Sequence, residues 1–97
     1  MVKYSIINVE TEAKRGLRNM RQALNAKRGK KVNVYIEHKL FGKQHLVLDR
    51  FEPETEIGYG FHVGGQCIYI EKEDVLDWKV VHGTIMIQGK MMSIVID

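Results

Sequence analysis

The sequence predicts a small α+β domain in which one N-terminal amphipathic helix packs on a strongly bent antiparallel sheet that curls into a small barrel. The chain has 97 residues, a length typical of a single domain spanning residues 1–97. Apolar residues recur with helical spacing over residues 12–28, and from residue 31 onward they alternate as they do in strands. Glycine-containing turns between short alternating segments favour antiparallel pairing.

The first part of the chain predicts a short strand and then the helix. Residues 2–9 are rich in β-branched side chains, which favour a strand. Over residues 12–28, Thr11 offers an N-cap and Gly29 a C-terminal stop. Apolar residues at spacings of four, three and four form one stripe, made of Ala13, Leu17, Met20 and Leu24. The helix is therefore expected to dock with this stripe and to expose its other faces.

The rest of the chain predicts a series of short antiparallel strands. The alternating segments are residues 31–38, 45–51, 56–63, 66–71, 75–81, 84–88 and 91–96. Three dipeptides predict two-residue hairpin loops, namely Gly64-Gly65, His82-Gly83 and Gly89-Lys90. Gly58 and Gly60 lie inside one segment and indicate a bend or a close backbone approach. Such short, bent strands predict a meander that curls into a barrel, with the helix over one open end or edge.

Positive charge is concentrated near the helix. The segment Ala13–Lys31 holds eight of the fifteen Lys and Arg residues and no acid, whereas residues 51–97 carry eight acids against three lysines. On a helical wheel the cations form a second stripe beside the apolar one, made of Lys14, Arg18, Arg21 and Arg28, and Lys30 and Lys31 extend it. A basic ridge of this kind is typical of phosphate contacts.

Two other interpretations of the basic ridge stay open at this point. It can be a solvated helix face, or it can pair with the acidic run of residues 71–77 in the same or a neighbouring molecule. Pairing between molecules would assemble copies head to tail into a homo-oligomer. The acidic run itself, with Glu71, Glu73, Asp74 and Asp77, predicts a solvated turn because it lacks the glycine of calcium-binding loops.

The histidines and the cysteine predict no metal site. No spacing among the four histidines matches a helical metal pair or a zinc finger, and Cys67 is the single cysteine. No metal and no cofactor are therefore expected. His38 and His45 flank a loop that contains Lys39 and Lys43, which is the one enzyme-like arrangement in the sequence, in outline that of a small basic ribonuclease.

The expected location is the cytoplasm, without a membrane partner. No apolar run approaches the roughly 20 residues that span a bilayer. The opening residues "MVKYSIINVE" lack the longer apolar run of a signal peptide. A single cysteine suits a reducing compartment.

The order of one helix and about five bent strands, over residues 12–88, resembles the Sm-like fold. That family is an SH3-like barrel that includes the bacterial Hfq-type RNA chaperones. The segment "HLVLDRF", His45 to Phe51, looks like the family's second strand ending in an aspartate. Asp49 is followed by Arg50, Phe51 and Glu52 instead of the base-reading asparagine, so no functional residue is carried over. The resemblance implies an SH3-like barrel, RNA binding and assembly into rings.

The sequence thus predicts a small non-enzymatic nucleic-acid-binding module, with RNA placed before DNA by the resemblance alone. The residues expected to contact phosphates are Lys14, Arg18, Arg21, Arg28, Lys30 and Lys31. One alternative is a protein-interaction or regulatory module, of phage or mobile-element type, whose basic helix docks on an acidic partner. Another is a ribonuclease that uses His38 and His45.

Overall fold

The computed structural model describes residues 19–97, which form a compact α+β domain with one helix and antiparallel sheets. Residues 19–26 are helical. The strands that follow are β1 (Val32–His38), β2 (Gly42–Leu48), β3 (Pro53–Glu54), β4 (Gly58–Val63), β5 (Gln66–Glu71), β6 (Val75–Val81), β7 (Thr84–Gly89) and β8 (Met92–Ile96). A 3₁₀ turn, η1 (Lys72–Asp74), links β5 to β6. The strand predicted at residues 2–9 and the helical residues 12–18 lie outside the described residues.

The helix packs with its apolar stripe, as the sequence predicts. Met20 and Leu24 are fully buried, whereas Arg21 and Asn25 are exposed. Residues 27–29 form a turn, and Gly29 adopts φ +78°, in the left-handed region that favours glycine at the end of a helix. Ala13 and Leu17, which complete the predicted stripe, are outside the described residues.

The larger sheet has five strands in the order β2-β1-β8-β7-β6, and all neighbours are antiparallel. Strand β8 lies at its centre, with Ile96 opposite Val34 of β1 and opposite Ile85 of β7. Side chains that are directly opposite share a face of the sheet. One face therefore carries a continuous set of buried β-branched residues, namely Val32, Val34, Ile36, Ile85, Ile87, Ile94 and Ile96.

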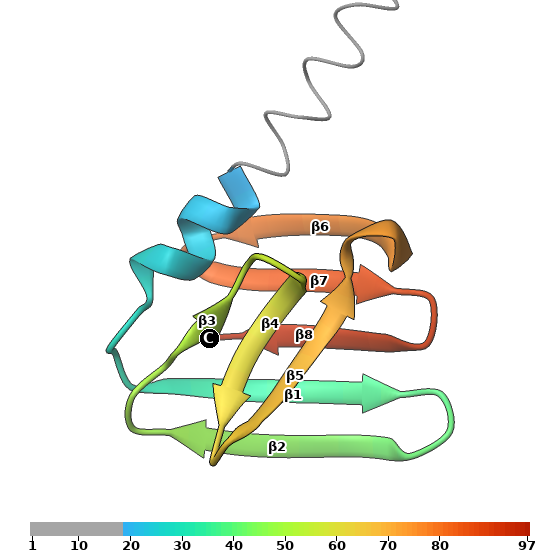
Figure 1. Ribbon diagram of the computed structural model, residues 1–97, viewed down its shortest axis with the longest axis horizontal. Helices are drawn as coiled ribbons and strands as arrows, with labels where there is room; N and C mark the ends of the chain where they lie inside the picture. The colour runs from blue at the N-terminus through green and yellow to red at the C-terminus, as the bar shows by residue number, and fades with distance from the viewer. Residues whose placement is uncertain (1–18) are drawn as a thin grey trace, which may run out of the picture.

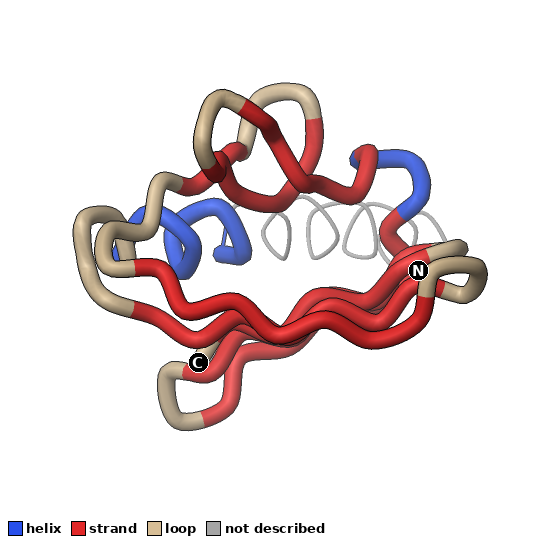
Figure 2. Tube along the Cα trace, turned by 90° about the horizontal axis from the view of Figure 1, so that it is seen from below, coloured by secondary structure: helices blue, strands red, loops and turns tan. Residues whose placement is uncertain are grey.

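The smaller sheet has three strands in the order β3-β4-β5 and crosses over the larger one (Figure 1). Figure 2 shows the two sheets as separate layers, with the helix on the same side of the larger sheet as the smaller one. Tyr59, Phe61 and Ile70 of the smaller sheet join Phe51 and the helix residues in one core with the larger sheet. Within residues 19–97, no helix or sheet covers the opposite face of the larger sheet, which we call the open face.

Two features of the predicted topology differ from the structure. The sheets are not closed, so the predicted barrel is not confirmed. The strands also do not form one meander, because β8 returns to pair with β1 instead of ending at an edge. Residues 49–51 leave β2, and Phe51 exchanges backbone hydrogen bonds with the segment after the helix: Gly29 N–H donates to Phe51 O at 2.8 Å, and Phe51 N–H donates to Lys30 O at 2.9 Å.

The hairpin loops confirm two of the three predicted turns. Val63 pairs with Gln66 and Val81 pairs with Thr84, which leaves loops of two residues. Both residues of each loop have positive φ, as type I′ turns require: Gly64 at 53°, Gly65 at 86°, His82 at 51° and Gly83 at 82°.

The third turn was predicted in the wrong place. Gly89 is a buried residue of β7, and the loop is formed by Lys90 and Met91. Glycine is needed at residue 89 for space, because a Cβ atom there would lie 2.8 Å from Ile70 Cγ2. The close approach predicted at Gly60 is confirmed, since a Cβ atom there would lie 2.5 Å from Tyr69 Cα.

Candidate functional sites

The described part of the predicted basic ridge is exposed. Arg21 lies on the helix, and Arg28, Lys30 and Lys31 follow in the turn and the segment that leads into β1. Arg28 Nη2 donates to Asn25 Oδ1 at 3.1 Å, which orients this guanidinium along the helix surface. Lys14 and Arg18 of the predicted set lie outside the described residues.

These cations have no acidic partner in the described part of the chain. Within residues 19–97 the ion pairs join Lys90 to Asp74 at 3.5 Å and His62 to Glu54 at 2.9 Å. Neither pair involves the basic ridge, so pairing of the ridge with the acidic run of the same molecule is not seen among these residues. The backbone hydrogen bonds of Phe51 with Gly29 and Lys30 bring another exposed cation, Arg50, to the same end of the sheet. We call Arg28, Lys30, Lys31 and Arg50 the basic cluster.

The open face of the larger sheet carries a stacked pair of rings. Tyr35 lies opposite His45 across β1 and β2, and their rings stack with centroids 4.5 Å apart and planes 5° apart. His45 Nε2 also lies 3.1 Å from Asn33 Oδ1, which holds the imidazole in place. The pair borders a shallow depression of about 350 Å³ that Lys43 and Val95 help to line. Tyr35 is 45% exposed, so a flat apolar group can reach this stack from solvent.

The predicted ribonuclease pair does not come together. Tyr35 faces His45 and His38 faces Gly42 in the β1–β2 register, so the two histidines lie on opposite faces of the sheet. His38 Nδ1 accepts a hydrogen bond from Leu40 N–H at 3.0 Å, which serves the hairpin turn. The two histidines therefore do not meet across the hairpin, because His38 is three residues along β1 from Tyr35, the partner of His45.

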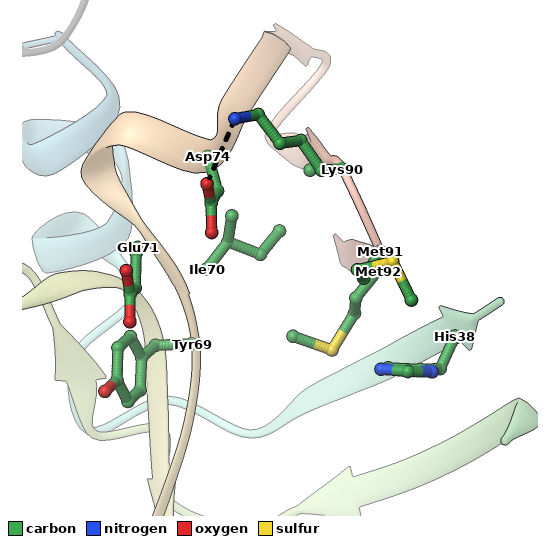
Figure 3. Close-up of a pocket in the computed structure, with 9 residues that line it drawn as sticks. His38, Tyr69, Ile70, Glu71, Asp74, Lys90, Met91 and Met92 are labelled. Carbon is green, nitrogen blue, oxygen red and sulfur yellow. Dashed lines mark ion pairs between the residues drawn. The ribbon is translucent and has the colours of Figure 1, made fainter. Parts of the chain in front are cut away.

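A pocket of about 290 Å³ lies between η1 and the β7–β8 turn (Figure 3). The Asp74–Lys90 ion pair crosses its rim. Glu71 lies at one end of the pocket and His38 at the other, so acid and imidazole do not converge (Figure 3). A hydrogen bond with Glu73, together with the charges of Glu73 and Asp74, raises the pKa of the Glu71 carboxyl above its ordinary value. This arrangement fits the predicted solvated acidic turn.

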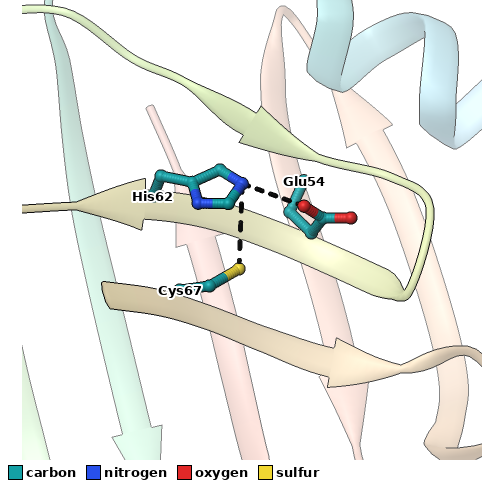
Figure 4. A group of neighbouring side chains, drawn as sticks. All are labelled: Glu54, His62 and Cys67. Carbon is teal, nitrogen blue, oxygen red and sulfur yellow. Dashed lines mark hydrogen bonds and ion pairs between the residues drawn. The ribbon is translucent and has the colours of Figure 1, made fainter. Parts of the chain in front are cut away.

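A compact polar cluster occupies the outward face of the smaller sheet (Figure 4). Glu54 of β3, His62 of β4 and Cys67 of β5 place one ligand atom each within 4.8 Å of the others. Glu54 Oε2 lies 2.9 Å from His62 Nε2, and Cys67 Sγ lies 4.0 Å from the same nitrogen. Phe61, the residue beside His62, points the other way and is fully buried in the core.

The surroundings of this cluster shift the pKa values of its carboxyl and its thiol. Backbone N–H groups of Ile57 and Glu56 donate to Glu54 Oε1 at 3.1 and 2.9 Å, and these bonds, with His62 as a further partner, hold the pKa of the Glu54 carboxyl below its ordinary value. Burial raises the pKa of the Cys67 thiol, and the Glu54 carboxylate adds to that shift. Near neutral pH the Glu54 carboxyl is therefore ionised and the Cys67 thiol is neutral, and both lie beside Nε2 of His62.

The spacing of these three residues in the sequence does not by itself predict that they meet, although one signal is present. A two-residue loop at Gly64-Gly65 makes Val63 and Gln66 partners, and the next pair along the ladder is His62 with Cys67. The position of Glu54 carried no such signal, because β3 is only two residues long and follows an irregular segment.

Comparisons with protein-family models, curated proteins and solved structures found no match. In the described part of the chain, no helix is long and apolar enough to cross a membrane.

Proposed function

We propose that the protein is a small non-enzymatic module that binds single-stranded nucleic acid, with RNA preferred to DNA. The observation that carries this proposal is the basic cluster, whose exposed cations have no acidic partner among residues 19–97. Cations left free by the fold are available to replace the counterions of a phosphate backbone. Arg21 of the described helix, and Lys14 and Arg18 of the predicted ridge, would extend the same contact surface.

The open face supports a single strand as the ligand. Unpaired bases stack on exposed aromatic rings, and duplex bases do not offer their faces in this way. The Tyr35–His45 stack stands on the same two strands that the basic cluster flanks, since Lys31 precedes β1 and Arg50 follows β2. A strand that binds the basic cluster through its phosphates can continue onto this stack with its bases. The preference for RNA comes from the Sm-like resemblance, as does the expectation of an oligomer.

The test is a titration of fluorescent single-stranded RNA, single-stranded DNA and duplex DNA with the full chain, followed by anisotropy at several salt concentrations. Four to six phosphate contacts predict a log–log slope of about −3 to −5. Arg28→Glu with Lys30→Glu should remove two contacts and flatten the slope on single strands by about 1.4. The matched control is Lys39→Glu with Lys90→Glu, which makes the same change in net charge around the opposite, β7–β8 end of the sheet.

A second set of variants tests the stack. Tyr35→Ala should weaken binding to single strands roughly 5- to 150-fold, which corresponds to about 1–3 kcal/mol for one stacked base. Tyr35→Phe keeps the ring and should bind as the unmodified protein does. Equal losses on single strands and duplex would count against a stacking role, and a flat salt dependence would count against the proposal as a whole.

A second function is favoured by one observation at the tip of the β1–β2 hairpin. Leu40 and Phe41 are 73% and 83% exposed, and exposed apolar side chains next to Lys39 and Lys43 suit an acidic protein partner. Absence of oligonucleotide binding at low salt, together with recovery of a partner that Phe41→Ser abolishes, would support this adapter function in place of the first.

A further inference from the structure

The arrangement of Glu54, His62 and Cys67 excludes a nucleophilic triad. In such a triad the acid binds one ring nitrogen of the histidine and the nucleophile faces the other. Here both Glu54 Oε2 and Cys67 Sγ approach Nε2, at 2.9 and 4.0 Å. The thiol therefore does not face Nδ1, the nitrogen that would have to accept its proton while the acid orients the ring through Nε2. The cluster needs another explanation.

We propose that Glu54, His62 and Cys67 form a Zn²⁺ site on the outward face of the smaller sheet. A carboxylate oxygen, an imidazole nitrogen and a sulfur are three donor types that zinc accepts, and the sulfur disfavours magnesium and calcium. Bonds of about 2.0 Å to nitrogen or oxygen and about 2.3 Å to sulfur place ligand atoms roughly 3.3–3.5 Å apart around a tetrahedral zinc ion. The observed separations of 2.9 and 4.0 Å from His62 Nε2 lie on either side of that value, and all three ligand atoms lie within 4.8 Å of one another, so side-chain rotations would close the site around the ion.

The three donors point to a common position. Figure 4 shows the imidazole between the carboxylate and the sulfur, with both dashed contacts ending on the same nitrogen. A metal ion at this position would bind Nε2 of the neutral imidazole, whose ring proton then lies on Nδ1, and would displace the thiol proton to water. Three protein ligands leave a fourth position for a water molecule.

The backbone around the site holds the ligands in place. Glu54 Oε1 is occupied by the N–H groups of Glu56 and Ile57, which directs Oε2 toward the site. The β4–β5 ladder fixes His62 directly opposite Cys67. His62 has 43% of its side chain exposed, so a hydrated ion reaches the site from solvent without any opening of the fold.

A bound ion would fasten β3, the shortest strand among residues 19–97. β3 has two residues and pairs with β4 through Pro53 and Glu54 alone. Zinc bonds to Glu54, His62 and Cys67 join β3, β4 and β5, so the ion would act as a clamp across the smaller sheet. Binding to the folded state alone raises the unfolding temperature, by ~10 °C or more when free zinc exceeds its Kd a hundredfold.

The experiment uses the full chain, freed of metal with a chelator and carrying no affinity-tag histidines. Zinc per chain is measured after equilibrium dialysis, and Co²⁺ is then added as a spectroscopic probe. We expect one zinc per chain, a thiolate-to-cobalt charge-transfer band, and at least about tenfold weaker zinc binding in Cys67→Ser and in His62→Gln. The matched control is His45→Gln, which removes an exposed histidine from the other sheet and should leave zinc binding unchanged.

Two results would overturn the proposal: no stoichiometric zinc on the unmodified chain, or zinc binding that persists in both Cys67→Ser and His62→Gln. If a variant fails to fold, alkylation of Cys67 in the unmodified chain decides the question. Zinc should slow alkylation of this thiol, the single one in the sequence, and an unchanged rate in saturating zinc would again overturn the site. Oligonucleotide binding with and without chelator is a separate measurement, so this proposal and the proposed function can fail independently.

Discussion

The two sheets present different chemistry on their outward faces. The open face of the five-stranded sheet is broad, and its stacked Tyr35–His45 pair lies on a surface of mixed polar and apolar side chains. The three-stranded sheet is narrow, and its outward face brings a carboxylate, an imidazole and a thiol to one point. A broad face with spaced groups suits an extended polymer, whereas converging donors suit an ion. Under the two proposals, the two faces would bind different kinds of ligand, a polymer on the broad sheet and an ion on the narrow one.

The inner faces differ as well, in how they are packed. The larger sheet packs through β-branched side chains that project from every second residue of β1, β7 and β8. In the smaller sheet, the buried aromatic residues of β4 alternate with Gly58 and Gly60. A side chain at either glycine would collide with residues of β5. The larger sheet should therefore be destabilised by truncating its buried side chains. The smaller sheet should be destabilised by replacing the glycines of β4 with larger residues.

The largest effect on stability is expected from Ile94→Ala. Ile94 is fully buried at the centre of the larger sheet, and loss of its side chain should cost about 2–5 kcal/mol. Val95→Ala, the next residue, faces the open side and should cost no more than about 1 kcal/mol. Denaturant unfolding followed by circular dichroism measures both. Equal costs would show that the open face is covered by packing that the described residues do not provide.

A smaller loss of stability is expected from Gly60→Ala, which adds atoms to a close contact instead of removing them from the core. The added methyl group meets the backbone of β5 at Tyr69 Cα, which cannot move aside cheaply, so the cost should be about 1–3 kcal/mol. Gly64→Asn is the control, because residue 64 has φ +53°, a conformation that asparagine tolerates, and no atoms lie within 4 Å of an added Cβ. The same denaturation measurement compares them. A neutral Gly60→Ala would mean that β4 and β5 lie farther apart than described.

The smallest effect on stability is its dependence on pH through Glu71, the last residue of β5. Its carboxyl has a raised pKa because of Glu73, so the folded protein holds this proton more tightly than the unfolded chain does. The resulting stability is fully present below the ordinary glutamate pKa and is lost as pH rises through the raised value. Glu73→Gln should reduce this loss of stability. The measurement is the urea midpoint of unfolding as a function of pH, from about pH 4 to pH 7. Glu56→Gln, the same change in an exposed loop, serves as control. An equal reduction of the pH dependence in this control would refute its assignment to Glu71 and Glu73.

Local features were predicted well from the sequence. The apolar stripe places Met20 and Leu24 in the core, and the dipeptides Gly64-Gly65 and His82-Gly83 set the β4–β5 and β6–β7 hairpins. These features depend on residues close together in the chain, whose spacing decides which face each side chain takes. The basic ridge was also visible, because a run of cations without acids needs no tertiary information.

Features that depend on distant contacts were missed. The pairing of β8 with β1 prevents the predicted meander, and no local pattern distinguishes a central strand from an edge strand. Tyr35 and His45 become a stacked pair only through the β1–β2 register, which also separates His45 from His38. Glu54 reaches His62 because β3 joins the smaller sheet over two residues, too short a segment to show periodicity.

The central place of β8 has a consequence for how the protein is made. During translation the β1–β2 and β6–β7 hairpins leave the ribosome before the strand that joins them, so the larger sheet stays in two pieces until Met92–Ile96 has emerged. Until then β1 and β7 each offer an unpaired edge and an apolar face to other chains. Nascent chains in which β8 has not yet emerged are therefore the ones most exposed to pairing with other chains. Release of this strand completes the larger sheet in one late step.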